Sequence, residues 1–164
     1  MKHPRLEAQC RIDTPLGPLT LAASARGLAG AWFDGQAHHP GPIDAPVNPA
    51  HPHLARAARE FAAYFAGRTT TFGVPLDAAG TEFQQAVWRA LCAVAPGATT
   101  SYGEVARRIG RAEAVRAVGA AVGRNPISVV VPCHRVLGRD GSLTGYAGGL
   151  DRKRALLALE GAEA

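Results

Sequence analysis

The chain has 164 residues, of which 47% are hydrophobic, enough to bury an ordinary core in one or two small domains. It contains no stretch of about 18 or more apolar residues and no long apolar core near its start, so we expect neither a membrane span nor an export signal. Its cysteines, Cys10, Cys92 and Cys133, have no paired spacing. This argues against a disulfide framework and favours a reducing compartment, the cytoplasm.

The positive charge is concentrated in the second part of the chain. The formal net charge is +5 and the sequence pI is about 9.6. Residues 1–98 hold 8 basic and 7 acidic side chains, whereas residues 99–164 hold 10 basic and 6 acidic ones. This asymmetry favours a nucleic-acid partner for the second part, and an ordinary arginine-rich surface is the alternative.

The first predicted elements form a small α/β lobe. Apolar runs at residues 19–22 and 28–33, separated by turn residues, predict an antiparallel hairpin or meander. Residues 34–53 are rich in proline and glycine and are expected to form a loop. The histidines of this loop and Cys10 lack zinc-finger spacing, so we expect no metal site. The apolar spacing from Leu54 to Phe65 predicts a helix that covers the hairpin.

A domain boundary is predicted near residue 80. Residues 69–80 are irregular and contain a proline, which is typical of a linker. We therefore expect an N-terminal lobe over residues 1–79 and a second, helical domain over residues 80–164. The second domain begins with a helix, because Thr81 and Gln84 fit the capping-box pattern.

A helix-turn-helix pattern follows in the second domain. Ser101 and Glu104 fit another capping box, at the start of a short helix that Gly110 ends, and residues 113–123 predict the next helix. This next helix is built mainly from small residues, Gly119 among them, so that its backbone can approach a surface closely. Either DNA or a neighbouring helix could be that surface.

The segment around Cys133 predicts a nucleophile. Residues 129–131 are valines that predict a buried strand, and Pro132 cannot continue its hydrogen-bond ladder. Cys133 would therefore lie at a rigid edge, with His134 and Arg135 as neighbours that could promote formation of its thiolate. A small buried hydrophobic residue is the alternative interpretation of Cys133.

Separated motifs identify the second domain with a known family. They are Arg116-Ala117-Val118-Gly119, Asn125-Pro126, Pro132-Cys133-His134-Arg135-Val136, Gly145-Tyr146-Ala147-Gly148-Gly149-Leu150 and Leu156-Leu157-Ala158-Leu159-Glu160-Gly161. In these motifs, and in their order and spacing, residues 81–161 resemble the O6-alkylguanine-DNA alkyltransferases, also called methylated-DNA-protein-cysteine S-methyltransferases. Residues 1–80 fit only as the variable N-terminal lobe of that family.

The resemblance implies both a fold and an activity. The fold is an α/β N-terminal lobe, a small antiparallel sheet plus a helix, followed by a mainly α, winged-helix-like domain with the helix-turn-helix. The implied protein is a stand-alone DNA repair enzyme that flips O6-alkylguanine out of duplex DNA and transfers the alkyl group irreversibly to Cys133, once per molecule. It needs no cofactor and no metal. Double-stranded DNA is the partner, the protein is expected to be a monomer, and cooperative assembly on DNA and activity on O4-alkylthymine stay open.

Site residues follow from the same resemblance. Cys133 would be the nucleophile, His134 the base, Glu160 the residue that orients His134, and Asn125 a support for the turn. Val136 and Ala147 would contact the guanine through backbone groups, and Tyr146 would line the pocket. Tyr102 would press on the DNA backbone, and Arg116 would fill the space of the flipped base. Arg124 and Gly119 complete the expected DNA-binding residues.

Some positions depart from common family patterns. Ser128 stands where some members have proline, and could widen the pocket. Leu159 and Ala155 stand where histidine and a large aromatic residue are frequent, and should alter helix packing. Other function classes remain as alternatives: a cysteine hydrolase, which would leave Arg116 unexplained, and a lesion-binding protein without transfer, which would not need Cys133.

Overall fold

The computed structural model describes residues 5–162, which divide into two compact units. One unit comprises the chain up to Ala79 together with Pro126–Ser128, and the other comprises Gly80–Asn125 and the chain from Val129 onward. The short segment Pro126–Ser128 was expected in the second domain. It pairs instead with Ala31 of the first unit, whose N–H donates to Pro126 O at 2.8 Å and whose carbonyl accepts from Ser128 N at 3.0 Å.

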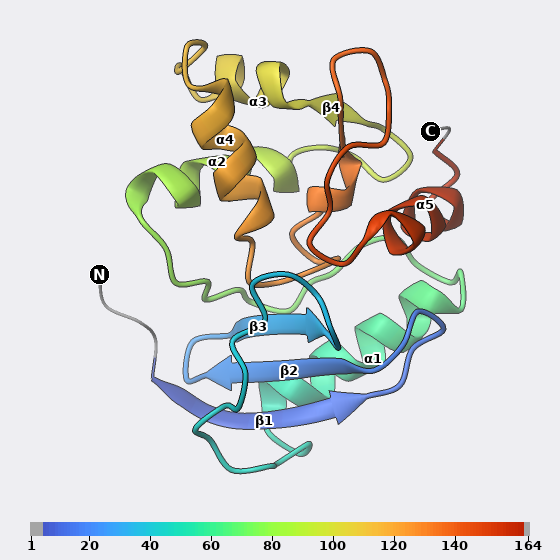
Figure 1. The fold of residues 1–164 in the computed structure, drawn as a ribbon. Helices are drawn as coiled ribbons and strands as arrows, with labels where there is room; N and C mark the ends of the chain where they lie inside the picture. The colour runs from blue at the N-terminus through green and yellow to red at the C-terminus, as the bar shows by residue number, and fades with distance from the viewer. Residues whose placement is uncertain (1–4, 163–164) are drawn as a thin grey trace. The chain divides into compact units, whose positions relative to one another are not determined.

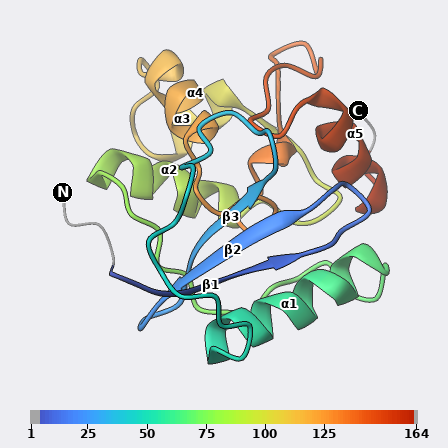
Figure 2. The same ribbon diagram turned by 60° about the horizontal axis from the view of Figure 1, so that its bottom comes forward.

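The first unit is a three-stranded antiparallel meander covered by one helix. Its elements are β1 (Leu6–Ile12), β2 (Leu19–Ser24), β3 (Leu28–Phe33) and α1 (Pro52–Phe65), and the strand order is β1-β2-β3. Helix α1 packs along the sheet (Figures 1 and 2). The predicted meander and helix are confirmed. Strand β1 was not predicted, because only its small residues Ala8 and Cys10 are buried, and they alternate with polar neighbours.

The second unit is mainly helical. Its elements are α2 (Glu82–Cys92), β4 (Thr100–Ser101), α3 (Tyr102–Arg108), α4 (Val115–Gly123), the 3-10 helix η1 (Cys133–Arg135), β5 (Val136–Leu137) and α5 (Leu150–Leu159) (Figure 1). Helices α3 and α4 are the predicted helix-turn-helix, and both pack against α2. The Trp88 indole of α2 donates to Ala121 O of α4 at 2.9 Å, which fixes these helices to each other.

The two predicted capping boxes differ in outcome. At the start of α2, the Thr81 side chain accepts from Gln84 N and the Gln84 side chain accepts from Thr81 N, so this box is complete. At the start of α3, the Ser101 hydroxyl accepts from Glu104 N at 3.1 Å. The Glu104 carboxylate does not return the bond, because it pairs with Arg107 at 2.7 Å.

The predicted strand over residues 129–131 is wrong. These valines form a turn, and Val129 has a φ of 73°, a left-handed conformation that a β-branched residue rarely adopts. The reason is tertiary: Val131 O accepts both the Asn125 amide and Cys133 N, at 2.8 Å each, which folds the chain back on itself. The strand begins after the cysteine, where β5 pairs in parallel with β4.

No helix within residues 5–162 is both long and apolar enough to cross a membrane.

Candidate active site

Cys133 lies at the first position of a tight turn and is almost enclosed. Pro132 precedes the 3-10 helix η1, and Cys133 is only 4% exposed. The Asn125 amide nitrogen donates to Cys133 Sγ at 3.2 Å and to Val131 O at 2.8 Å. One buried side chain thus holds both the thiol and the turn that carries it, as expected for Asn125.

The surroundings of Cys133 act on its ionisation in opposite directions. Burial is the largest influence and raises the pKa of the thiol. The Asn125 hydrogen bond, the positive charge of Lys153 and a backbone hydrogen bond each favour the thiolate. The net direction is upward, so Cys133 rests as a thiol and needs a base when it reacts.

His134 and Glu160 form the expected pair. His134 Nε2 lies 2.9 Å from Glu160 Oε2, and both side chains are completely buried. Glu160 also accepts from Arg135, whose Nε and second terminal nitrogen donate to the two carboxylate oxygens at 2.9 Å each. The other terminal nitrogen of Arg135 donates to Val94 O at 2.6 Å. Glu160 is therefore fixed by a bidentate arginine while it holds the histidine.

This geometry determines which nitrogen of His134 can accept a proton. Burial lowers the pKa of the imidazole, despite the opposing influence of Glu160, so the ring is neutral. A neutral ring beside a carboxylate donates its Nε2–H to that carboxylate, which leaves the lone pair on Nδ1. Among the described residues, none forms a hydrogen bond with Nδ1. Nδ1 is therefore the atom of the site that can accept a proton. Within residues 5–162, no direct hydrogen bond joins His134 to Cys133.

The glycine-rich loop before α5 carries the expected pocket residues Tyr146 and Ala147, both partly exposed. A Cβ atom at Gly148 would lie 2.8 Å from Tyr146 Cε1, so only glycine lets the loop fold this closely over the ring. Gly149 closes the loop with a φ of 92° and donates its N–H to Tyr146 O at 2.9 Å. Val136 is completely buried at the start of β5.

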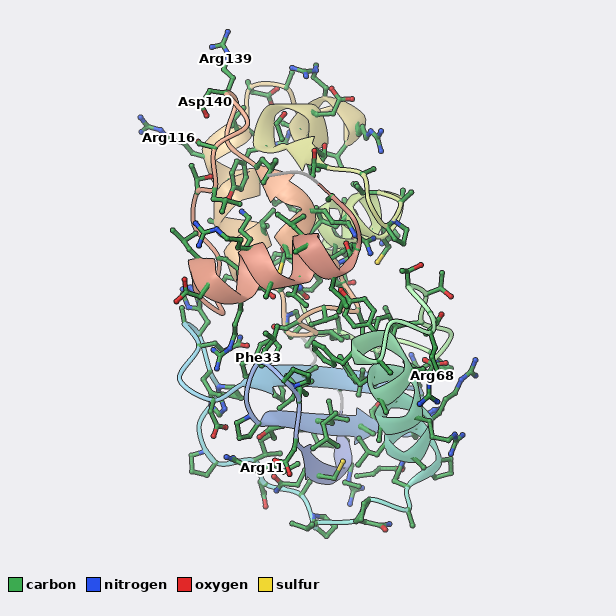
Figure 3. All side chains as sticks on the ribbon, turned by 90° about the vertical axis from the view of Figure 1, so that its right-hand side faces the viewer. Arg11, Phe33, Arg68, Arg116, Arg139 and Asp140 are labelled. Carbon is green, nitrogen blue, oxygen red and sulfur yellow. The ribbon has the colours of Figure 1, made fainter. Side chains whose placement is uncertain are left out.

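A pocket of about 520 Å³ opens at the start of α3. The expected residue Tyr102 lines it together with Arg107 and Arg139. Arg139 is exposed in the loop after β5, and its side chain points outward at the same end of the unit as that of Arg116 (Figure 3). Within residues 5–162, Arg139 makes no ion pair, so its charge is available to a partner.

Helix α4 presents an exposed face of small residues next to Arg116. Arg116 and Arg124 are both exposed, and neither forms an ion pair in the described part of the chain. A Cβ atom at Gly119 would lie 3.8 Å from the Tyr102 ring, an ordinary contact, and one at Gly123 would meet nothing within 4 Å. Internal helix packing therefore does not require either glycine. The structure favours the other interpretation, close approach of an external surface.

No group of three or more His, Cys, Asp or Glu side chains within residues 5–162 is placed to hold a metal ion. The described cysteines Cys10, Cys92 and Cys133 are all free.

Comparisons with known proteins cover both units. The family model "6-O-methylguanine DNA methyltransferase, DNA binding domain" matches residues 82–162, and the model of the ribonuclease-like domain of the same proteins matches residues 11–78. A methylated-DNA-protein-cysteine methyltransferase of Mycolicibacterium paratuberculosis is 50% identical over 149 residues, covering 91% of this chain and 89% of the relative. The chain belongs to the 6-O-methylguanine DNA methyltransferase family.

More distant relatives and solved structures agree with this membership. A methyltransferase of the same name from Methanosarcina barkeri is 46% identical over 150 residues, covering 91% of this chain and 94% of the relative. The crystal structure of Mycobacterium tuberculosis OGT in complex with DNA superposes with a TM-score of 0.87 at 47% identity, covering 94% of this chain and 92% of that one. The predicted two-part fold is thereby confirmed as the fold of this family.

Sequence reasoning missed three cationic residues of this methyltransferase. Arg135 was noted only as a neighbour of the thiol, but its partner is Glu160, 25 positions later. Arg139 lies outside every recognised motif. The side chain of Lys153 is completely buried. The sequence distinguishes this residue only by its rarity, because Lys2 and Lys153 are the only lysines among the 18 basic residues.

Proposed function

We propose that Cys133 is the alkyl acceptor of this methylated-DNA-protein-cysteine methyltransferase, a DNA repair enzyme whose partner is DNA. The observation that carries the assignment is the hydrogen bond from the buried Asn125 amide to Cys133 Sγ, 3.2 Å long, in a turn next to the His134–Glu160 pair. Of the other free cysteines, Cys10 belongs to β1 of the first unit, and Cys92 ends α2 with no such support.

The acceptor would be activated by His134. Glu160 and Arg135 hold the imidazole with Nδ1 as its lone-pair atom, and Nδ1 would take the thiol proton through a water molecule. The thiolate then attacks the alkyl carbon in line with the leaving oxygen. The S–C bond forms, the C–O bond breaks, its electron pair stays on the purine O6, and the proton passes to the guanine. A thioether does not readily return the alkyl group, so each molecule reacts once.

Base flipping would depend on the exposed face of α3 and α4. The alkyl group of O6-alkylguanine is hidden inside the duplex and must be turned out of the stack before a thiolate can reach it. Arg116 is exposed and has no ion-pair partner among the described residues, which suits a side chain that fills the vacated space. Tyr102 lines the adjacent pocket, and Arg124 and Gly119 lie on the same helix as Arg116. Val136, Tyr146 and Ala147 would receive the flipped base.

The proposal is confined to O6-alkylguanine. Ser128 in this position could widen the pocket and admit O4-alkylthymine. The Ser128 hydroxyl instead donates to Gln36 Oε1 at 3.2 Å, within the first unit, and this supports a role in holding residues 126–128 to that unit.

We assign DNA binding and alkyl transfer to residues 80–164 other than Pro126–Ser128, and the variable N-terminal lobe to residues 1–79, because the proposed site residues all come from the second unit. Free cysteines support the cytoplasm as the location.

The test is intact mass spectrometry after incubation with a duplex oligonucleotide that contains O6-methylguanine, followed by peptide mapping. One added methyl group on Cys133 is the expected result, with none on Cys133→Ala. A methyl group on Cys10 or Cys92 would refute the assignment. If the protein binds the duplex, gains no mass and leaves the lesion in place, it is a lesion-binding protein, and a lesion removed without mass gain would indicate a hydrolase.

A further inference from the structure

Val129 has a backbone conformation that its residue type disfavours. Within residues 5–162, two residues other than glycine have a positive φ, His38 at 59° and Val129 at 73°. His38 is exposed in the loop between β3 and α1, whereas Val129 is buried, with only 1% of its surface exposed. A β-branched side chain in the left-handed region is crowded against its own backbone, so this conformation costs folding free energy. The rest of the structure must therefore impose it.

The segment before Val129 is held by the first unit. The Ala31 N–H donates to Pro126 O at 2.8 Å, and the Ser128 N–H donates to Ala31 O at 3.0 Å. The Ser128 hydroxyl also donates to the side-chain oxygen of Gln36 at 3.2 Å, and both side chains are buried. These hydrogen bonds fix the direction in which the chain enters Val129.

The segment after Val129 is held by Asn125. Val131 O accepts from the Asn125 amide and from Cys133 N, at 2.8 Å each. The same amide donates to Cys133 Sγ at 3.2 Å. Val129 is the residue at which the chain returns to the second unit, so the change of direction between two fixed segments falls on it. The turn that carries the thiol therefore begins at a strained residue.

Relief of strain does not explain a valine at this position, because glycine would adopt the same conformation without strain. A β-branched side chain restricts its own backbone to narrow ranges of φ and ψ. With both neighbouring segments fixed, valine holds the turn in one conformation, whereas glycine would permit several. Rigidity matters for an in-line attack, since misplacing a reacting group by about 1 Å can slow a reaction about a hundredfold.

We propose that Val129 is a positioning residue for alkyl transfer, whose strained and rigid conformation fixes the turn on which Asn125 holds Cys133 Sγ. This rests on the proposed function, in which Cys133 is the acceptor. Val129 acts through the turn, by limiting how far the thiol can move away from the line of attack. The chain thereby gives up folding stability for a fixed nucleophile, as is typical of strain stored beside a functional site.

The first test compares the stabilities of Val129→Gly and Val129→Ala, which both remove the branched side chain. Only alanine keeps the steric cost of a left-handed φ, so Val129→Gly should unfold at the higher urea concentration of the two. Val87→Gly and Val87→Ala are the matched control, because Val87 is a completely buried valine within α2. In a helix the order is opposite, and the glycine variant should be the less stable. If Val129→Gly is no more stable than Val129→Ala, Val129 is not strained and the proposal is overturned.

Single-turnover methyl transfer at saturating duplex then reports the positioning role. Despite its greater stability, Val129→Gly should have a maximal rate about tenfold below that of Val129→Ala, because a looser turn lets the thiol leave the line of attack. The duplex concentration that gives half of the maximal rate should be the same for both, since the proposed DNA-binding residues lie on or next to α3 and α4. A merely structural role would make the more stable variant at least as fast. Equal rates, or faster transfer by Val129→Gly, would overturn the proposal.

A third variant, Val129→Thr, separates rigidity from stability. Threonine keeps the β-branched shape but places a hydroxyl in a buried position, so it should unfold at a lower urea concentration than the unaltered protein. Its maximal transfer rate should stay within about threefold, because the turn stays rigid. A larger loss would overturn the proposal, and this variant decides the question if the glycine and alanine variants do not fold. Peptide mapping tests the proposed function separately: a methyl group on another cysteine would refute that function and leave the stability orders at Val129 and Val87 unaffected.

Discussion

The substitution Glu160→Gln is expected to destabilise the second unit strongly, because a glutamine side chain cannot accept all the hydrogen bonds that the Glu160 carboxylate accepts. Oε1 accepts from Arg135 Nε, whereas Oε2 accepts from both His134 Nε2 and Arg135. A glutamine amide must place its NH₂ group at one of these two positions. In either orientation a donor then faces a donor, and the buried Arg135 has lost its counter-charge.

The magnitude follows from burial. Glu160 is 0% exposed and Arg135 only 7% exposed at their side chains, and breaking a buried pair from one side typically costs about 3–5 kcal/mol. We therefore expect the free energy of unfolding to fall by about 3 kcal/mol. For a chain of this length, that corresponds to a melting temperature lower by roughly 6–12 °C.

Urea unfolding followed by fluorescence and circular dichroism measures this loss, and the variant Trp32→Phe is used as the background so that Trp88 of the second unit is the one tryptophan left. Glu113→Gln is the matched control, because Glu113 pairs with Arg111 at 3.1 Å with both side chains exposed, and it should cost less than about 0.5 kcal/mol. Arg135→Met added to Glu160→Gln should recover part of the loss, since no unpaired charge then remains buried. Equal losses in Glu160→Gln and Glu113→Gln would refute the reasoning.

Three further outcomes are expected. Arg116→Ala should slow methyl transfer from duplex DNA much more than transfer from a single strand, because an unpaired base needs no flipping. Equal slowing of the two in a single-turnover assay would contradict the role of Arg116 in base flipping. Gly119→Ala should raise the free energy of unfolding by up to about 1 kcal/mol, because alanine favours helix and its Cβ meets only an ordinary contact. The same substitution should weaken duplex binding in a titration. An unchanged affinity would argue against close approach of DNA to the helix at this position. The lowered pKa of His134 means that the unfolded chain binds a proton near pH 6.5 and below while the folded one does not. Stability should therefore fall as the pH drops below about 6.5 in urea titrations, and less so in His134→Gln.

The sequence by itself determined the elements whose causes are local. The capping box of Thr81 and Gln84, the apolar spacing of α1 and the turn residues between β2 and β3 act over a few positions, so their patterns predict structure directly. Motif order was sufficient to identify the family, and adjacency placed Cys133 beside His134.

Only the tertiary structure decided how the site is held together. The valines before Pro132 have the pattern of a strand, but Asn125 bonds Val131 and folds them into a turn, a contact that no periodicity encodes. Arg135 and Lys153 find their partners, Glu160 and the carbonyls of Val136, Thr144 and Gly145, across as many as 25 positions of chain. Buried polar groups must be satisfied by whatever the fold brings near, and that depends on packing rather than on neighbours in the sequence.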